Sequence, residues 1–326
     1  MNHNIIITSA GQRVALVKDF QETLRRFFPG AMVYTTDMDP KFAPATHVSD
    51  DHFEVLKVTD PQYISQLIEL CKDKGIGMIV PTIDTELQVL AENKELFEEN
   101  GIAVIVSTLD FIKICRDKRN TGEFFESHDI RVPRPIDKNN PTFPLFAKPY
   151  DGSLSTNLHY IKNAEELTEE ILNDPKLLFM EYIDKEVYKE YTVDMYYGRD
   201  HKVKCIVPRE RIKIRAGEIN KGRTEKYPLT QYFYDRFKTI DGCVGCICIQ
   251  IFFNPNTNDV VGIEVNPRFG GGYPQTYAVG GNFPELLIRE YYLGEQVDYF
   301  DNWKDKILML RYDDAIFYDE KNRCLL

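Results

Sequence analysis

Three oxygen-bearing side chains, Gln250, Glu264 and Asn266, have a spacing that suits cation binding. Glu264 and Asn266 are two residues apart in an apolar, β-branched run, and side chains at such a spacing leave the same face of a strand. Gln250 is the one polar residue of a second apolar strand at 246–253. A hairpin with the loop 255–259 places Gln250 opposite Glu264. These ligands suit Mg2+ that also contacts phosphate, and an exposed polar strand face is the alternative.

Two lysines occupy positions where an anionic ligand would explain them. Lys118 falls in the first turn of a predicted helix, where the helix dipole disfavours a cation. Lys148 is the one charge of an apolar strand at 143–149, and the hydroxyl-rich loop 150–157 follows it. Backbone N–H groups of such a loop can fold over a triphosphate. The alternatives are a solvated surface lysine and an ordinary hairpin turn.

Four cations recur at period two in residues 207–215, namely Arg209, Arg211, Lys213 and Arg215. If this segment is a strand, all four lie on one face. Such a stripe would concentrate positive potential in a chain whose net charge is -11. A solvated edge strand is the rival interpretation, because charge on an edge also deters aggregation.

The first 115 residues alternate strands and helices in the manner of an open parallel sheet. The predicted strands are 5–8, 31–35, 77–80 and 102–106, and the predicted helices are 14–27, 61–74 and 86–100. The turn 9–13 after the first strand contains one glycine, whereas the dinucleotide fingerprint needs three. NAD binding is therefore disfavoured.

Composition excludes several classes of function. A length of 326 residues favours more than one domain, and 43% hydrophobic residues are ample for sizeable cores. The net charge of -11 argues against nucleic acid as the main partner. No run approaches the roughly 18 apolar residues of a membrane span, and the N-terminus lacks a cationic lead, so we expect a cytoplasmic protein. The spacing of the seven cysteines disfavours zinc.

The ordered elements together resemble the ATP-grasp superfamily, most closely the synthetase unit of the carbamoyl phosphate synthase large subunit and its stand-alone relatives. The resemblance covers nearly the whole chain and is most specific at its last block. It rests on Asp117-Lys118, Phe146-Ala-Lys148-Pro149, Met180-Glu181-Tyr182-Ile183, Glu190-Tyr-Thr-Val-Asp194, Gln250 and Glu264-Val-Asn266-Pro-Arg268. It implies a fold of the α/β and α+β classes: an N-terminal open parallel sheet at 1–115, a small lid subdomain at 116–187 and a C-terminal subdomain with the metal site at 188–326.

The resemblance also implies a role for each matching residue. The implied nucleotide-binding residues are Lys118, Lys148, Asp151, Gly152, Ser153, Glu181, Tyr182, Ile183 and Glu190. Among them, residues 181–183 match the adenine linker and Glu190 matches the ribose contact. The implied metal ligands are Gln250, Glu264 and Asn266. The implied catalytic residues are Arg268, Lys148 and Arg211. The implied substrate-binding residues are Arg209, Arg211 and Arg215.

The implied activity is that of an ATP-dependent carboxylate-amine ligase, which forms an acyl phosphate and releases ADP and phosphate. The implied cofactors are ATP and Mg2+, with Mn2+ as the alternative metal, and the partners are a small carboxylate and an amine; a homodimer is left open. A kinase of the same fold and a nucleotide-binding pseudoenzyme are the alternatives. Synthesis of carbamoyl phosphate alone is disfavoured because the chain has one synthetase unit. Biotin carboxylation is disfavoured because no carrier segment is present, although a separate chain could supply one.

Overall fold

The N-terminal part of the computed structural model, which describes residues 3–151, 157–319, 321 and 324–325, is an open parallel sheet. Its strand order is β3-β2-β1-β4-β5, and every pairing is parallel. The strands are β1 (Asn4–Thr8), β2 (Val33–Asp37), β3 (Asp51–Glu54), β4 (Ile76–Pro81) and β5 (Ala103–Val104). The predicted parallel sheet is confirmed. The edge strand β3 was not predicted, because its sequence Asp-His-Phe-Glu carries no apolar alternation.

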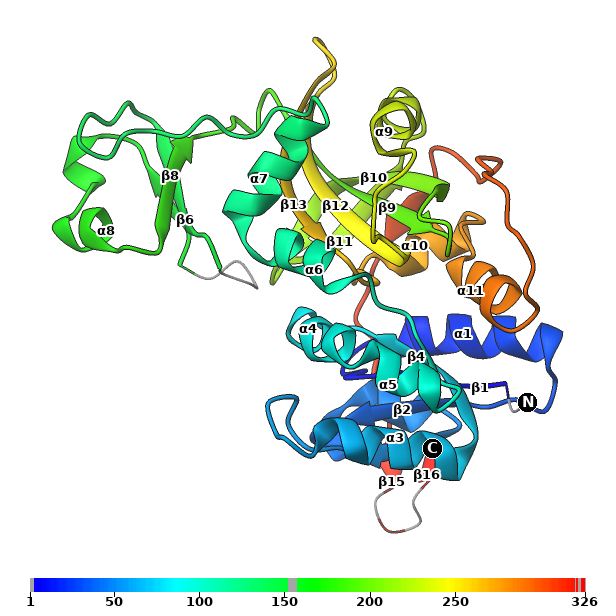
Figure 1. The fold of residues 1–326 in the computed structure, drawn as a ribbon. Helices are drawn as coiled ribbons and strands as arrows, with labels where there is room; N and C mark the ends of the chain where they lie inside the picture. The colour runs from blue at the N-terminus through cyan, green and yellow to red at the C-terminus, as the bar shows by residue number, and fades with distance from the viewer. Residues whose placement is uncertain (1–2, 152–156, 320, 322–323, 326) are drawn as a thin grey trace.

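Helices cover this sheet, as Figure 1 shows in blue and cyan. They are α1 (Val14–Phe27), the 3-10 helix η1 (Pro40–Phe42), α2 (Pro44–Val48), α3 (Tyr63–Lys74), α4 (Asp84–Glu92) and α5 (Lys94–Glu99). The single helix predicted at 86–100 is two helices, divided at Asn93. The Asn93 backbone leaves the helical region, and its side-chain Nδ2 donates to the carbonyl of Val89 at 2.8 Å. This local hydrogen bond competes with the continued helix.

A six-stranded antiparallel sheet forms the centre of the C-terminal part, in the order β13-β12-β9-β10-β11-β14. Its strands are β9 (Lys189–Tyr197), β10 (Val203–Arg215), β11 (Glu218–Thr224), β12 (Gly245–Asn254), β13 (Asp259–Asn266) and β14 (Leu308–Leu310). The helices of this part are α9 (Leu229–Phe237), α10 (Tyr273–Ala278) and α11 (Phe283–Tyr291). One apolar core joins this part to the first sheet, because Phe20 of α1 packs edge-on against Phe269.

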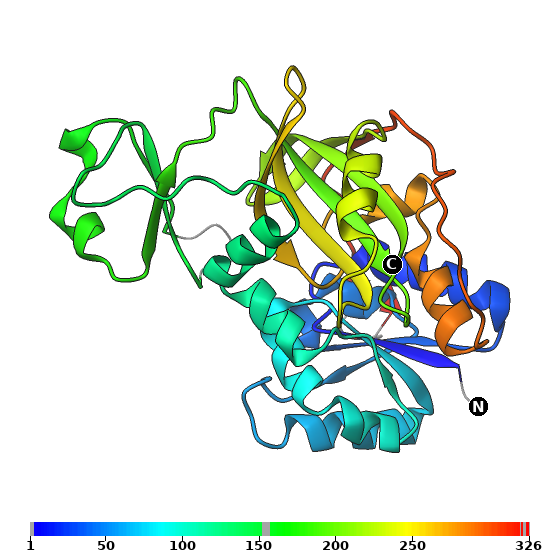
Figure 2. The same cartoon turned by 45° about the horizontal axis from the view of Figure 1, so that its top comes forward.

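A three-stranded sheet stands apart from the other two, in the order β7-β6-β8 (Figures 1 and 2). It consists of β6 (Leu145–Pro149), β7 (His159–Ile161) and β8 (Leu177–Glu181), with the 3-10 helix η2 (Ala164–Glu166) and α8 (Glu169–Asn173). The connecting helices are α6 (Leu109–Arg116) and α7 (Lys118–Ser127). Phe124 and Phe125 of α7 share a core with β9 and β12, so α7 is anchored to the larger sheet.

The last strands described return to the N-terminal part of the molecule. After β14, the short strands β15 (Tyr318–Asp319) and β16 (Cys324–Leu325) pair with each other near the N-terminal sheet (Figure 1). The Tyr318 ring lies 4.3 Å from the ring of His47. None of the helices described is long and apolar enough to cross a membrane.

The β12–β13 hairpin pairs as predicted at its functional end, although its loop is different. Asn254 pairs with Asp259, so the loop has one residue fewer than expected. A register shift at Ile263 then adds the missing residue, and Gln250 lies opposite Glu264. A β-bulge of this kind places two residues of one strand against one of its partner. The predicted register is therefore confirmed at Glu264 and wrong at the turn.

Candidate active site

A cavity of about 860 Å³ lies where the three sheets meet. Its lining includes loops of the N-terminal sheet, strands β6 and β8 of the small sheet, and strands β9 to β13 of the large sheet. Eight arginines and lysines but only five acidic residues line it. Since the whole chain carries a net charge of -11, the cavity concentrates positive charge against the overall balance and favours an anionic ligand.

The end of β13 carries a line of polar side chains across the cavity floor. Asn266 donates from Nδ2 to Glu264 Oε1 at 2.9 Å, which confirms that the two side chains share a face. Arg268 Nη2 approaches Asn266 Oδ1 at 3.4 Å and donates to Asp84 Oδ2 at 2.7 Å. Because Asp84 begins α4, this line of contacts joins the hairpin to the N-terminal sheet.

The donor chemistry at this place fits a hard cation. Glu264 offers a carboxylate, while Gln250 and Asn266 offer amide oxygens. Within the described ranges, no cluster of three or more His, Cys, Asp or Glu residues could hold a metal. A cation bound here would therefore complete its coordination with nucleotide oxygens and water, as Mg2+ commonly does. The hydrogen bonds of Asn266 would have to rearrange for its oxygen to take part.

Lys148 and Lys118 line the cavity on the side nearest the small sheet. The pKa of Lys148 is lowered to about 8, chiefly by burial; the negative charge of Glu264 opposes this shift, and the positive charge of Lys118 adds to it. Burial also lowers the pKa of Lys118, again opposed by Glu264. Holding a buried and a half-buried ammonium group near each other is costly, so an anion between them would be favoured.

The predicted phosphate loop is described only at its beginning. Asp151 lies outside the cavity lining and pairs with Lys176 Nζ at 2.9 Å. Gly152 and Ser153 lie outside the described residues. A nucleotide role for these three residues stays a prediction.

The linker after β8 forms the apolar side of the cavity. Glu181, Tyr182 and Ile183 all line it, together with Phe146 and Phe252. Apolar side chains beside exposed backbone groups suit a flat heterocycle such as adenine, which needs both contact area and a few hydrogen bonds. A role of these three residues in adenine binding stays a prediction.

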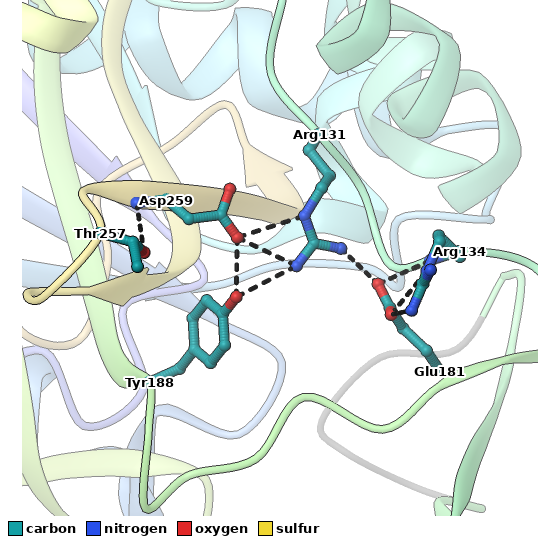
Figure 3. A network of polar contacts seen from close by, with 6 residues as sticks. All are labelled: Arg131, Arg134, Glu181, Tyr188, Thr257 and Asp259. Atoms are coloured by element: carbon teal, nitrogen blue, oxygen red, sulfur yellow. Dashed lines mark hydrogen bonds and ion pairs between the residues drawn. The ribbon is translucent and has the colours of Figure 1, made fainter. Parts of the chain in front are cut away.

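The Glu181 side chain forms an ion network with two arginines (Figure 3). Arg131 pairs with one oxygen of Glu181, and the Arg134 side chain donates to the other at 2.8 Å. Burial alone would raise the pKa of Glu181, but the hydrogen bonds of Arg134 and Arg131 hold it below its ordinary value. Arg131 also binds Asp259 of the β13 start at 3.1 Å. The network thus ties the small sheet to the hairpin.

Glu190, the predicted ribose contact, lines the cavity and carries an ion pair. Its Oε1 lies 2.9 Å from Arg211 Nε, and its Oε2 lies 3.9 Å from Lys185 Nζ. Arg211 also donates to Thr192 Oγ1 at 3.3 Å and to the Gly217 carbonyl at 2.9 Å. These contacts hold Glu190 and Arg211 in fixed positions on the β9–β10 wall.

The cationic stripe of β10 lies on one face only in its first half. Arg209 is 1% exposed and donates twice to Asp194, each time at 2.8 Å. Register shifts on both sides of Lys213 break the alternation, so Ile214 lines the cavity. Arg215 is exposed and pairs with Asp313 instead. The prediction that Arg215 shares the face of Arg209 is wrong because β-bulges reverse the side-chain direction.

Two charged cavity residues of the N-terminal sheet were not predicted. Arg13 follows β1, and Asp84 follows β4. Both strands lie at the centre of the sheet, where the order reverses direction and ligands of open α/β sheets bind. Arg13 ends the turn 9–13, which the sequence singles out only for its shortage of glycines; the position of this turn after the first strand is the signal that could have identified Arg13.

Comparison with known families gives two matches. The description of the first family is "PylC-like, N-terminal domain", and its model matches residues 5–105. The second is an ATP-grasp family described by its place "in the biosynthetic pathway with Ter operon", and its model matches residues 173–314. The predicted ATP-grasp resemblance is confirmed. No curated protein matches the chain.

Solved structures show the same fold. The biotin carboxylase domain of Hydrogenobacter thermophilus 2-oxoglutarate carboxylase, in complex with MgADP, has a TM-score of 0.70 at 16% identity, with 94% of this chain and 74% of that chain covered. Staphylococcus aureus N5-carboxyaminoimidazole synthetase with ADP also scores 0.70 at 16%, with 95% and 81% covered. Bacillus licheniformis L-amino acid ligase scores 0.65 at 15%, with 89% and 74% covered.

Proposed function

We propose that this chain, an ATP-grasp fold behind a PylC-like N-terminal domain, is an ATP-dependent ligase that joins a carboxylate to an amine through an acyl phosphate. The observation that carries the proposal is the meeting of two sets of residues in one cavity. The lysines Lys118 and Lys148 face the same space as the oxygen donors of the β12–β13 hairpin. Phosphoryl transfer depends mainly on such positioning and neutralisation of charge.

The residues divide the work of the first half-reaction. Lys118 and Lys148 would bind nucleotide phosphates, while residues 181–183 would hold adenine and Glu190 would accept from the ribose. Gln250, Glu264 and Asn266 would hold Mg2+, or Mn2+, which supplies charge neutralisation between the phosphates when bound. Arg268 is steadied by Asp84 at 2.7 Å and would orient the carboxylate whose oxygen attacks the γ-phosphorus. That attack releases ADP and forms the acyl phosphate.

The second half-reaction needs no protein nucleophile. The amine nitrogen attacks the acyl carbon, the phosphate leaves, and the amine loses a proton. Arg211 lines the same cavity and would shield the developing negative charge. Neither Lys148 nor Arg268 forms a covalent bond in this scheme.

The test is Mg2+-dependent ADP release from pooled carboxylates, each pool tested with and without pooled amines. Glu264→Gln protein serves as the control for metal-dependent turnover. ADP release that requires both pools is the expected result. Release with a carboxylate pool alone would favour a kinase. Tight ATP binding without release in any pool would favour the pseudoenzyme and contradict the ligase.

The acyl phosphate has a separate test once a productive carboxylate pool is found. Carboxylate labelled with ¹⁸O should transfer one labelled oxygen to inorganic phosphate, because the attacking oxygen leaves with the phosphoryl group. Mass spectrometry of the phosphate measures this transfer. Unlabelled phosphate alongside amide product would exclude the intermediate.

A further inference from the structure

We infer that Arg13 and Arg209 form a second anion subsite, which binds the non-reacting anionic group of a substrate that carries two anionic groups. This inference rests on the proposed function, because the reacting carboxylate is assigned there to Arg268. It deepens that function by naming the substrate class: a small dianion rather than a simple monocarboxylate.

The position of Arg13 is the first argument. Arg13 ends the turn that follows the central strand β1 and lies immediately before α1, at the point where the strand order of the sheet reverses. Ligands of open α/β sheets bind in the crevice at this point. The crevice opens into the same cavity as Arg209 and Arg268, since all three arginines line it.

Unpartnered N–H groups are the second argument. Arg13 Nη1 and Arg209 Nη1 are both shielded from solvent and have no hydrogen-bond partner among the described residues. A buried donor without a partner costs about 1–3 kcal/mol, and more when the group is charged. Two other N–H groups of Arg209 already donate hydrogen bonds to Asp194. An acceptor oxygen on the ligand would satisfy both vacant donors.

Gly272 shows how closely the backbone approaches this subsite. A Cβ at Gly272 would lie 2.2 Å from Arg209 Nη1 and 2.8 Å from Ile219 Cγ2. Both distances are too short for a real contact, so a side chain here would push the guanidinium out of place. Glycine therefore preserves the position of the very N–H group that lacks a partner.

Charge is the third argument. The described residues provide Arg209 with Asp194 and Arg268 with Asp84 as ion-pair partners, but they provide no such partner for Arg13. Glu218, whose negative charge acts on Arg13, forms its ion pair with Arg311, at 3.3 Å. Burial lowers the pKa of Arg13, and the nearby positive charge of Arg268 lowers it further, although Glu218, Cys248 and Asp84 oppose this. A ligand anion would relieve this cost.

Arg268 and Arg209 are held by carboxylates on different elements, so we assign them to different anionic groups of the substrate. Arg268 is tied to the hairpin through Asn266 and to Asp84, which places it at the metal side. Arg209 is tied to Asp194, beneath Gly272. A substrate with one carboxylate would satisfy Arg268 and leave the donors of Arg13 and Arg209 vacant.

The experiment measures binding of succinate and glutarate against butyrate and valerate, which have matched chain lengths. Isothermal titration is done with and without saturating MgADP at constant free Mg2+, because dicarboxylates bind the metal. The variants are Arg13→Gln, Arg13→Lys, and Arg26→Gln as a control on the exposed end of α1, where Arg26 is 54% exposed. Thermal unfolding of each variant verifies that it folds.

The expected result is binding of at least one dicarboxylate about tenfold or more tighter than its matched monocarboxylate, since charge-assisted hydrogen bonds are the strong ones. Arg13→Gln should abolish this preference and leave MgADP affinity unchanged. Arg13→Lys should restore part of it, and Arg26→Gln should keep all of it.

Three results would overturn the inference. These are no dicarboxylate preference in the wild type, an unchanged preference in Arg13→Gln, and a loss of MgADP affinity in Arg13→Gln, which would assign Arg13 to the nucleotide. If Arg13→Gln does not fold, the Arg13→Lys titration decides, because an unaltered preference there contradicts a geometry specific to guanidinium. Failure of MgADP to bind the wild type would contradict the proposed function instead, while the titration without nucleotide still decides the subsite.

Discussion

Two sides of the cavity hold their positive charges in different ways: the lysine side, with Lys118 and Lys148, and the arginine side, with Arg13, Arg209 and Arg268. Burial lowers the pKa of both Lys148 and Lys118, and the largest opposing effect on both comes from the negative charge of Glu264. On the other side, Arg209 and Arg268 each have a dedicated carboxylate partner, Asp194 and Asp84. The positive charge of Lys148 therefore lowers the free energy of unfolding, whereas Arg209 and Arg268 are held in place by ion pairs of the fold.

This difference indicates what each side is for. A buried ammonium group such as that of Lys148 gains most from a highly charged ligand such as a triphosphate. A guanidinium held by a carboxylate has a fixed direction and retains other N–H groups for a planar anion. The lysine side therefore suits the nucleotide, and the arginine side suits the substrate.

The largest expected effect is at Glu264, which lies between the two sides. Glu264→Gln removes the one carboxylate of the predicted metal site and the negative charge that supports both lysines. We expect Mg2+-dependent ADP release to fall by at least about a hundredfold, because even residues outside the metal's direct contacts commonly cost 10–100-fold. Steady-state ADP release at varied Mg2+ measures this.

The fold should survive this change, because Gln keeps the shape and the hydrogen bond from Asn266. Thermal unfolding of the variant should therefore stay close to that of the wild type. Full activity in Glu264→Gln would contradict the assignment of the metal site.

Lys148→Met should separate function from stability on the lysine side. We expect MgADP affinity to fall about tenfold or more, because a charge-assisted contact with phosphate is lost. The variant should nevertheless be more stable without nucleotide, by up to about 3 kcal/mol, because each unit of pKa shift corresponds to about 1.36 kcal/mol. Titration calorimetry and urea unfolding measure the two quantities. A variant that is less stable at pH 7 would contradict a costly buried charge.

The pH dependence of stability should show the same cost. The pKa of Lys148 is about 8 when folded and near its ordinary 10.5 when unfolded. The unfolded chain therefore binds more protons between these values, and the free energy of unfolding rises with pH in that window. The stability gained by Lys148→Met should be complete below pH 8 and disappear toward pH 10.5. Urea unfolding of both proteins across this range measures it, and a constant difference would disprove the shift.

The smallest expected effect is at Asp84 on the arginine side. Asp84→Asn keeps the hydrogen bond to Arg268 but removes the negative charge, so the direction of Arg268 is less well fixed. We expect the KM for the carboxylate to rise a few-fold, roughly 1 kcal/mol, with little change in the KM for ATP. A rise in the KM for ATP alone would instead assign Arg268 to nucleotide binding.

The sequence predicted those parts of the molecule that local periodicity determines. The parallel N-terminal sheet, the limits of α1 and the pairing of Gln250 with Glu264 follow from alternation and turn residues. The failures occur where backbone irregularity overrides the pattern. The bulge at Ile263 corrects the hairpin register, while those around Lys213 turn Arg215 away from the cavity.

The arginine side was the least predictable part of the site. Asp84 and Arg13 reach the cavity because the parallel sheet brings the ends of β1 and β4 together, a relation between residues 71 positions apart that no local motif records. Burial and missing partners are likewise properties of the folded chain. The lysines and the hairpin were predictable because they lie in motifs.

The division of the cavity is tested most directly by titrating MgADP into the wild type, Lys148→Met and Arg13→Gln under the same conditions. Lys148→Met should bind MgADP about tenfold or more weakly than the wild type, whereas Arg13→Gln should bind it as the wild type does. Equal losses in the two variants, or a loss confined to Arg13→Gln, would contradict the assignment of the nucleotide to the lysine side.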